Sequence, residues 1–144
     1  MTYMIVTWKN DDFLKISIKS GKPQNVEFTD LALIPGSVNE YKLRVITDKK
    51  SEYDITFDFQ NLADAVDALD DNLYVKIEYG GRIYYEDKLA AFYENNDCAF
   101  TVDLTDNYYT DILLTYYIPI EVGNEIQGCV ADFNLQVTAQ EKRD

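Results

Sequence analysis

The sequence predicts an all-β protein that folds as an antiparallel β-sandwich, jelly-roll-like or immunoglobulin-like, with one or two short helices. Apolar and polar residues alternate along many short segments, which is the period of a strand with one buried face. Turn residues separate these segments at short intervals. Tyr accounts for 12 of the 144 residues, and its amphipathic ring suits half-buried sheet faces. At this length we expect one domain over residues 1–144.

Alternation identifies five strands in the first half of the chain, at residues 3–8, 13–18, 26–28, 41–46 and 53–59. A turn is expected at residues 34–37, because Pro35 and Gly36 occupy the positions that a type II turn prefers. Residues 47–51 are a polar connection of hairpin length between the last two strands.

Residues 61–71 interrupt the alternation. Leu62, Val66 and Leu69 fall at helical spacing, and Asn61 is a good N-cap, so we expect one short surface helix here. Residues 87–94 could form one or two further helical turns.

The second half of the chain returns to strands, at residues 73–79, 82–85, 100–104, 109–118 and 133–139. Gly80 and Gly81 predict a tight hairpin between the first two of these strands. Two-sheet sandwiches and jelly rolls have this density of short strands and tight turns.

The formal charge is −13, from 26 acidic and 13 basic residues. Such a charge repels phosphate backbones and anionic membranes, so we expect no nucleic-acid partner and no membrane insertion. The charge is explained either by solubility or by binding of a cation or a basic partner.

The chain contains no histidine, which excludes a Ser-His-Asp site and a zinc protease of the HExxH type. No single Asp or Glu stands out in an apolar setting that would raise its pKa for catalysis. We therefore expect a protein that is not an enzyme and needs no cofactor.

Neither the apolar runs nor the first residues resemble a targeting segment. Ile112–Leu114 with its Tyr neighbours is too short to span a bilayer, and residues 1–12 lack the parts of a signal peptide. Two compartments stay open: the cytosol, if the chain begins at its native start, or the outside of the cell, if an export signal was removed.

Cys98 and Cys129 each lie near the start of a predicted strand. A disulfide could join them if those strands pair in the sheet. The alternative is two thiols that act as small apolar residues.

The C-terminal third carries one recognisable pattern: a Tyr-rich strand ending at Tyr116-Tyr117-Ile118-Pro119, a Gly123-Asn124-Glu125-x-Gln127-Gly128 loop, and a last strand from Phe133 to Gln140. It resembles the ending of the TasA/camelysin family, secreted matrix-fibre proteins of Gram-positive bacteria. The Leu33-Ile34-Pro35-Gly36 turn before a strand is also similar to that family. The same residue types are ordinary turn formers, which is the alternative explanation.

The resemblance implies an exported jelly-roll-like subunit of the cell surface or biofilm matrix, which associates with itself or with a related matrix protein. In such fibres an N-terminal strand of one subunit would complete a sheet of the next. Residues 1–10 hold the candidate donor strand here, namely Tyr3, Met4, Ile5, Val6, Thr7 and Trp8. An ordinary edge strand within its own subunit is the alternative. The metallopeptidase activity associated with camelysin is not carried over, because this chain has no histidine.

The alternative function is a carbohydrate- or calcium-binding module. Asp64, Asp67 and Asp71, or Asp103, Asp106 and Asp111, would supply oxygen ligands for Ca²⁺, although both groups also fit a solvated surface. Adjacent Tyr pairs at 84–85, 108–109 and 116–117 should each place one ring inward and one outward, and outward rings could stack on sugars.

Overall fold

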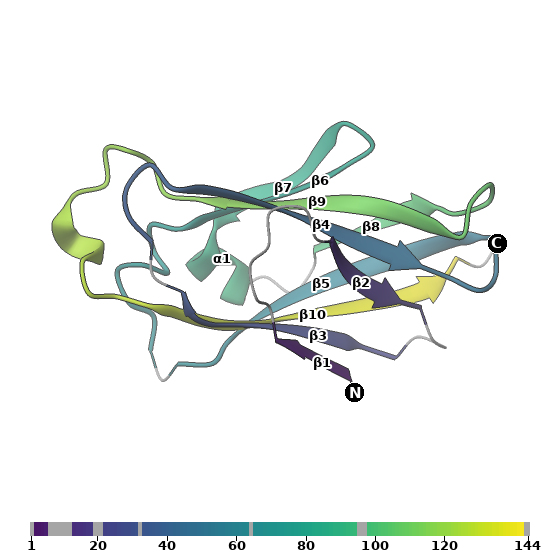
Figure 1. The fold of residues 1–144 in the computed structure, drawn as a ribbon, viewed down its shortest axis with the longest axis horizontal. Helices are drawn as coiled ribbons and strands as arrows, with labels where there is room; N and C mark the ends of the chain where they lie inside the picture. The colour runs from purple at the N-terminus through teal and green to yellow at the C-terminus, as the bar shows by residue number, and fades with distance from the viewer. Residues whose placement is uncertain are drawn as a thin grey trace.

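A computed structural model of the chain contains two five-stranded sheets packed face to face (Figure 1). It describes residues 2–5, 13–18, 22–31, 33–63, 65–94 and 98–142. Sheet A has the order β1-β3-β10-β5-β8, formed by Thr2–Ile5, Gln24–Leu31, Ala131–Glu141, Glu52–Asn61 and Cys98–Asp103. Sheet B has the order β2-β4-β9-β6-β7, formed by Phe13–Ser17, Val38–Ile46, Tyr109–Tyr117, Tyr74–Tyr79 and Arg82–Lys88.

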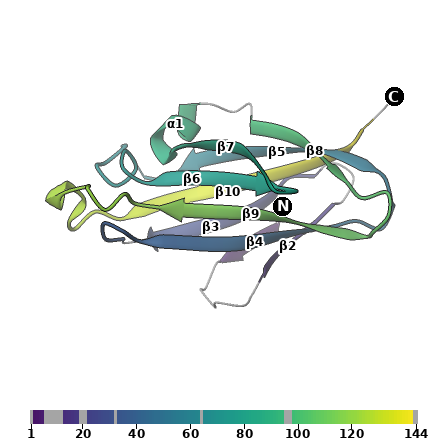
Figure 2. The same ribbon diagram turned by 90° about the horizontal axis from the view of Figure 1, so that it is seen from above.

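The last eight strands have jelly-roll topology. The order β3-β10-β5-β8 in one sheet faces β4-β9-β6-β7 in the other, so each connection crosses between sheets except the β6–β7 hairpin (Figure 2). All pairings among these eight strands are antiparallel. The predicted all-β sandwich is therefore confirmed. β1 and β2 extend one edge of each sheet by pairing in parallel with β3 and β4.

The core lies between the sheets and follows the alternation of the sequence. In β5 the odd-numbered residues Tyr53, Ile55, Phe57 and Phe59 are buried, and β10 buries its odd-numbered residues in the same layer. Burial of each such side chain contributes about 1.5–3 kcal/mol to folding. Tyr41 and Tyr116 share this core, with stacked rings and hydroxyl oxygens 2.8 Å apart.

Two predicted turns form as expected. The N–H of Ser37 donates to the carbonyl of Ile34 at 3.1 Å, and Gly36 has φ of 86°, which a type II turn requires at its third position. Gly80 and Gly81 have φ of 61° and 79° and close the β6–β7 hairpin.

The helix expected over residues 61–71 is wrong. Described residues of this segment form bends and turns, and Leu62 and Val66 are exposed while Leu69 is buried. Side chains take the backbone donors that a helix would use: the Asp67 carboxylate accepts from the N–H of Asp70, and the Asp70 carboxylate accepts from the N–H of Asp67, each at 3.1 Å.

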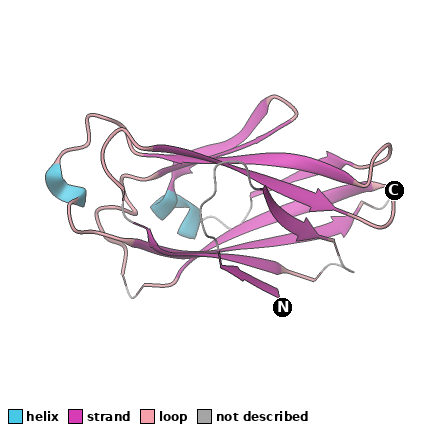
Figure 3. Cartoon of the chain, in the orientation of Figure 1, coloured by secondary structure: helices cyan, strands magenta, loops and turns pink. Residues whose placement is uncertain are grey.

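The α-helix of the structure is instead α1, Leu89–Glu94, within the second segment where helical turns were expected (Figure 3). Leu89 and Phe92 face the core, and the Tyr93 hydroxyl donates to the Asp70 carboxylate at 3.2 Å. Asp70 thereby holds α1 against the 67–73 turn. A 3-10 helix, η1, spans Asn124–Ile126. No helix in the described ranges has the length and apolar character needed to cross a membrane.

The buried Asp70 predicts a pH dependence of stability. Burial is the main cause that raises the pKa of Asp70 above its ordinary value, and the nearby Asp67 carboxylate adds to it. The folded state therefore holds the proton more tightly than the unfolded state, whose pKa is about 3.9. The contribution of Asp70 to the free energy of unfolding is fully present below that value and is lost as the pH rises through the raised folded pKa.

Asp70→Asn should remove this loss. We expect the free energy of unfolding of the variant minus that of the wild-type chain, from urea denaturation, to be more positive at pH 7 than at pH 3.5. A difference that stays constant or falls as the pH rises would contradict the role of burial at Asp70.

Candidate functional site

The segment predicted for assembly lies at one edge of sheet A. β1 contains Tyr3, Met4 and Ile5 of the predicted donor segment and begins one residue earlier, at Thr2. Val6, Thr7 and Trp8 lie outside the described residues. β1 pairs in parallel with β3, from Thr2 opposite Gln24 to Ile5 opposite Glu27.

β1 has a partner strand on one side only, because it lies at the edge of sheet A. Among the described residues it is also the one strand of this sheet whose pairing is parallel. Parallel pairing is also slightly less stable per residue than antiparallel pairing. Edge elements with few contacts are the ones that open first in native proteins, so β1 is the strand of sheet A most suited to exchange.

The opposite edge of sheet A, β8, is covered by hydroxyl groups from sheet B. The Tyr85 hydroxyl donates to the carbonyl of Ala99 and accepts from the N–H of the same residue, both at 3.0 Å. The Tyr79 hydroxyl accepts from the N–H of Asp103 at 3.1 Å. In an antiparallel pair the backbone groups of alternate residues point away from the partner strand, and these bonds place Ala99 and Asp103 in that outward set.

The two edges of sheet A therefore differ. An exposed edge offers unpaired N–H and C=O groups to any additional strand, and native proteins block such edges. On β8 both backbone groups of Ala99 and the N–H of Asp103 are already bound, and Thr101 between them is half-buried. Strand addition is therefore disfavoured at β8. At the opposite edge of sheet A, β3 already pairs with β1 as a parallel strand.

Sequence reasoning missed this role of Tyr79 and Tyr85. The Tyr84-Tyr85 pair was expected to place one ring inward and one outward, and Tyr84 stacks on the core residue Phe100, with ring centroids 4.4 Å apart. The bonds to β8 join strands of different sheets, 14 and 24 residues apart in the chain. No local pattern indicates a contact of that kind.

Removing the two hydroxyls should open the β8 edge. Tyr79→Phe with Tyr85→Phe keeps both rings but frees three backbone groups, at a cost of about 0.5–1.5 kcal/mol per lost hydrogen bond. We expect a folded chain by circular dichroism that associates more strongly than the wild-type chain in sedimentation velocity.

Two further variants control this measurement. Tyr84→Phe removes a neighbouring hydroxyl that has no hydrogen bond to β8 among the described contacts and should leave association unchanged. Thr101→Pro, added to the double variant, removes the middle one of the three outward N–H groups of β8 and should weaken the new association. If the double variant sedimented like the wild-type chain, the two hydroxyls would not block strand addition at β8.

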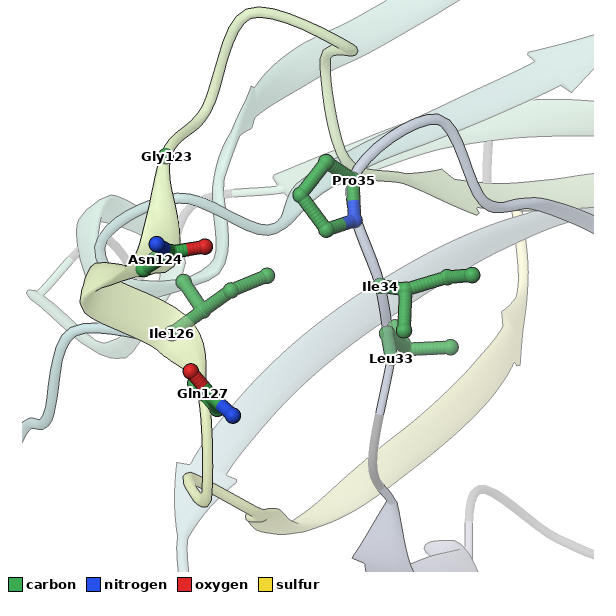
Figure 4. A pocket seen from close by; sticks show the side chains of 7 residues that line it. All are labelled: Leu33, Ile34, Pro35, Gly123, Asn124, Ile126 and Gln127. Atoms are coloured by element: carbon green, nitrogen blue, oxygen red, sulfur yellow. The ribbon is translucent and has the colours of Figure 1, made fainter.

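The two motifs that carry the family resemblance meet at one end of the sandwich (Figure 4). The N–H of Gly36 donates to the carbonyl of Ile118 at 2.8 Å, and the N–H of Ile118 donates to the carbonyl of Ser37 at 2.9 Å. Between the turn and the η1 loop lies a pocket of about 260 Å³. It is lined by Leu33, Ile34, Pro35, Gly123, Asn124, Ile126 and Gln127.

None of these lining residues is ionisable. The pocket offers apolar surface and two amide side chains, which suits binding of a chain segment or another protein better than acid–base chemistry. The turn and the loop are 83 or more residues apart in the sequence, so their proximity follows from the topology and could not be read from either motif alone.

Of the two alternatives left open for Cys98 and Cys129, the structure has two thiols and no disulfide between them. Strands β8 and β10 are not paired, because β5 lies between them. In the pairing of β8 with β5, Cys98 lies opposite Phe57. In the pairing of β10 with β5, Phe133 lies opposite Asn61, and Cys129 precedes Phe133 in the chain. Phe57 and Asn61 are four residues apart along β5, or about 13 Å, which is more than the roughly 7 Å that a disulfide spans between Cα atoms.

Three of the acidic residues weighed as calcium ligands, Asp67, Asp103 and Asp111, are engaged with the protein itself. Asp111 forms a bidentate pair with Arg44, at 2.8 and 3.1 Å, which lowers the pKa of Asp111, and Asp103 accepts from Thr105. Asp67 and Asp70 bind each other's N–H groups, and Asp64 lies outside the described residues. Within the described ranges no three acidic or thiol side chains gather closely enough to hold a metal ion.

The Tyr pairs follow the predicted inward and outward alternation only in part. Tyr116 is buried, and its neighbour Tyr117 stacks on Tyr74 on the outer face of sheet B. Burial and a hydrogen bond to Glu86 raise the pKa of Tyr117 to about 12. Tyr108 and Tyr109 are both about half exposed, at 54% and 50%, because Tyr108 precedes β9 in a bend.

The sequence matches no protein-family model, and no curated protein matches it. The function of this chain is therefore inferred from its fold, from the geometry of its sheet edges and from the motif resemblance.

Proposed function

We propose that this protein is a non-enzymatic structural subunit that assembles by β-strand addition, with β1 of one copy pairing on β3 of the next. It would act outside the cell, at the surface or in a biofilm matrix, bound to further copies of itself or to a related matrix protein. The observation that carries the proposal is the parallel pairing of β1 with β3 at the edge of sheet A. The motif similarity to the TasA/camelysin family supports it.

Strand exchange costs little in this geometry. A β1 strand supplied by another copy would make the same four residue pairs with β3 that the chain's own β1 makes. The main penalty is the freedom lost on association, which a high local concentration of subunits offsets. Blocked backbone groups at β8 would keep the exchange to one edge of sheet A.

Deleting residues 1–10 tests the proposal directly. We expect the truncated chain to remain a folded monomer, because β1 contributes only four pairs, and to lose any polymer that the full chain forms. Electron microscopy and sedimentation velocity at about 0.5 M NaCl measure this, since salt of that strength screens charge contacts and leaves main-chain pairing intact.

A peptide of residues 1–10 provides the matched control. It should bind the truncated chain in fluorescence anisotropy, whereas the same peptide with Tyr3→Pro and Met4→Pro should not, because one of two successive N–H groups must face β3. Polymers that persist without residues 1–10, or a full chain that stays monomeric at all concentrations, would refute strand addition.

A carbohydrate-binding module is the second candidate, favoured by the half-exposed rings of Tyr108 and Tyr109. The Lys50 ammonium lies 4.7 Å from the Tyr108 ring centroid, and the Arg44 guanidinium lies 4.4 Å from that of Tyr109. Rings held by cations are a surface on which sugars could stack. Calorimetry against glycans separates the two functions, since Tyr108→Ala with Tyr109→Ala would abolish sugar binding and leave strand addition intact.

A further inference from the structure

Three amide side chains form a chain of hydrogen bonds across the outer face of sheet A. The Asn134 Nδ2 group donates to Asn25 Oδ1 at 2.7 Å and to Gln60 Oε1 at 2.9 Å, and Gln60 Nε2 donates to the Asp58 carboxylate at 3.0 Å. These residues alternate with core residues of their strands, so they lie on the face of the sheet that points away from sheet B. The amide chain runs from β5 through β10 to β3, and Asn25 is its last member before β1.

Asn25 ends this amide chain with a free donor. The residue is 2% exposed, and its Nδ2 atom has no hydrogen-bond partner among the described residues, although buried N–H groups are nearly always paired. Since Oδ1 of the same amide is bound to β10, Nδ2 is the atom left for the other neighbour of β3, which is β1. Asn134 Oδ1 also lacks a partner, but β10 is flanked by β3 and β5, so a strand added at the edge does not reach it.

Glu27 follows Asn25 by two residues on the same face of β3, and its side chain is half-buried. Within the described ranges no hydrogen bond or ion pair reaches the Glu27 carboxylate. The five strands of sheet A contain no Lys or Arg that could pair with it. On the side where β1 pairs, β3 therefore presents a free donor and then a free carboxylate.

The sequence of β1 is poorly matched to these two groups. In the parallel register Tyr3 is opposite Asn25, and Ile5 is opposite Glu27. Isoleucine has no polar side-chain atom, and tyrosine carries its oxygen at the far end of a long ring, whereas asparagine is short. A strand with a short acceptor opposite Asn25 and a cation opposite Glu27 would use both groups, because side chains that face each other on paired strands interact directly.

We propose that the β3 edge is matched to a strand of another protein, which carries Asn or Asp opposite Asn25 and Lys or Arg opposite Glu27. This strand pairs in the register that β1 uses, continues the amide chain onto a fourth strand and displaces β1. The inference rests on the proposed strand addition and names the partner that the edge prefers, a related chain rather than a further copy.

Binding of synthetic strands to the full chain tests the match at Asn25. Peptides of residues 1–10 with Tyr3→Asn or Tyr3→Leu have side chains of similar size at this position, but only the first has an acceptor. Asn25→Leu removes the donor from the protein, and circular dichroism checks its fold. In fluorescence anisotropy, the preference for the Asn peptide over the Leu peptide should be about fivefold larger on the wild-type chain than on Asn25→Leu.

A second pair of peptides tests Glu27 independently. Ile5→Lys and Ile5→Met give side chains of similar length that differ in charge. The preference for the Lys peptide should be about threefold on the wild-type chain, weaken as NaCl increases and disappear on Glu27→Gln. Glu40→Gln, on sheet B, changes the net charge of the protein equally and should leave the preference unchanged.

The outcomes separate this inference from the proposed function. Preferences that depend on Asn25 and Glu27 as expected support the matched partner strand. If the peptide of wild-type sequence binds but the preferences are the same on Asn25→Leu and Glu27→Gln, as they would be if water satisfies Asn25, the inference is wrong and strand addition stands. A full chain that binds none of the peptides also contradicts the inference, and the deletion of residues 1–10 then decides separately whether strand addition builds the polymer.

Discussion

Packing of two sheets through one face of every strand is the constraint on which the rest of this structure depends. Alternation along β5 and β10 commits Phe57, Phe59, Phe133 and Leu135 to the core. Once those faces are buried, the chain can meet a partner only through its outer faces, its sheet edges and the two ends of the sandwich. The jelly-roll topology decides which residues those places receive.

The two edges of sheet A differ in whether their backbone N–H and C=O groups are available to another strand. β8 would be an exposed strand edge if sheet B did not reach it with Tyr79 and Tyr85. Because a tyrosine hydroxyl can donate and accept at once, Tyr85 alone binds both backbone groups of Ala99. β1 lies on the far side of the same sheet and pairs with β3 alone, in parallel.

Much of the fold could be predicted from the sequence, because alternation and turn chemistry are local. The strands at 41–46 and 53–59 and the turns at Gly36 and Gly80-Gly81 are examples. The segment after Asn61 was misjudged, since its apolar spacing fits a helix while the Asp67 and Asp70 carboxylates capture backbone donors. The choice between a disulfide and two thiols at Cys98 and Cys129 could not be made from the sequence, because strand order is a property of the whole chain.

The candidate site was predicted less well for the same reason. Tyr3–Ile5 could be singled out as strand-like, but its parallel partner β3 could not. The contact of the Pro35 turn with the η1 loop and the tyrosine hydroxyls bound to β8 can be predicted only once the topology is known.

Hydrogen exchange read by mass spectrometry, on dilute and concentrated samples of the full chain, tests most directly whether other copies bind this protein at the β1–β3 edge. The account predicts that a higher concentration slows amide exchange in β1 and β3, while exchange in β8 is unchanged. Slower exchange confined to β8, or to the outer faces of the sheets, would contradict it.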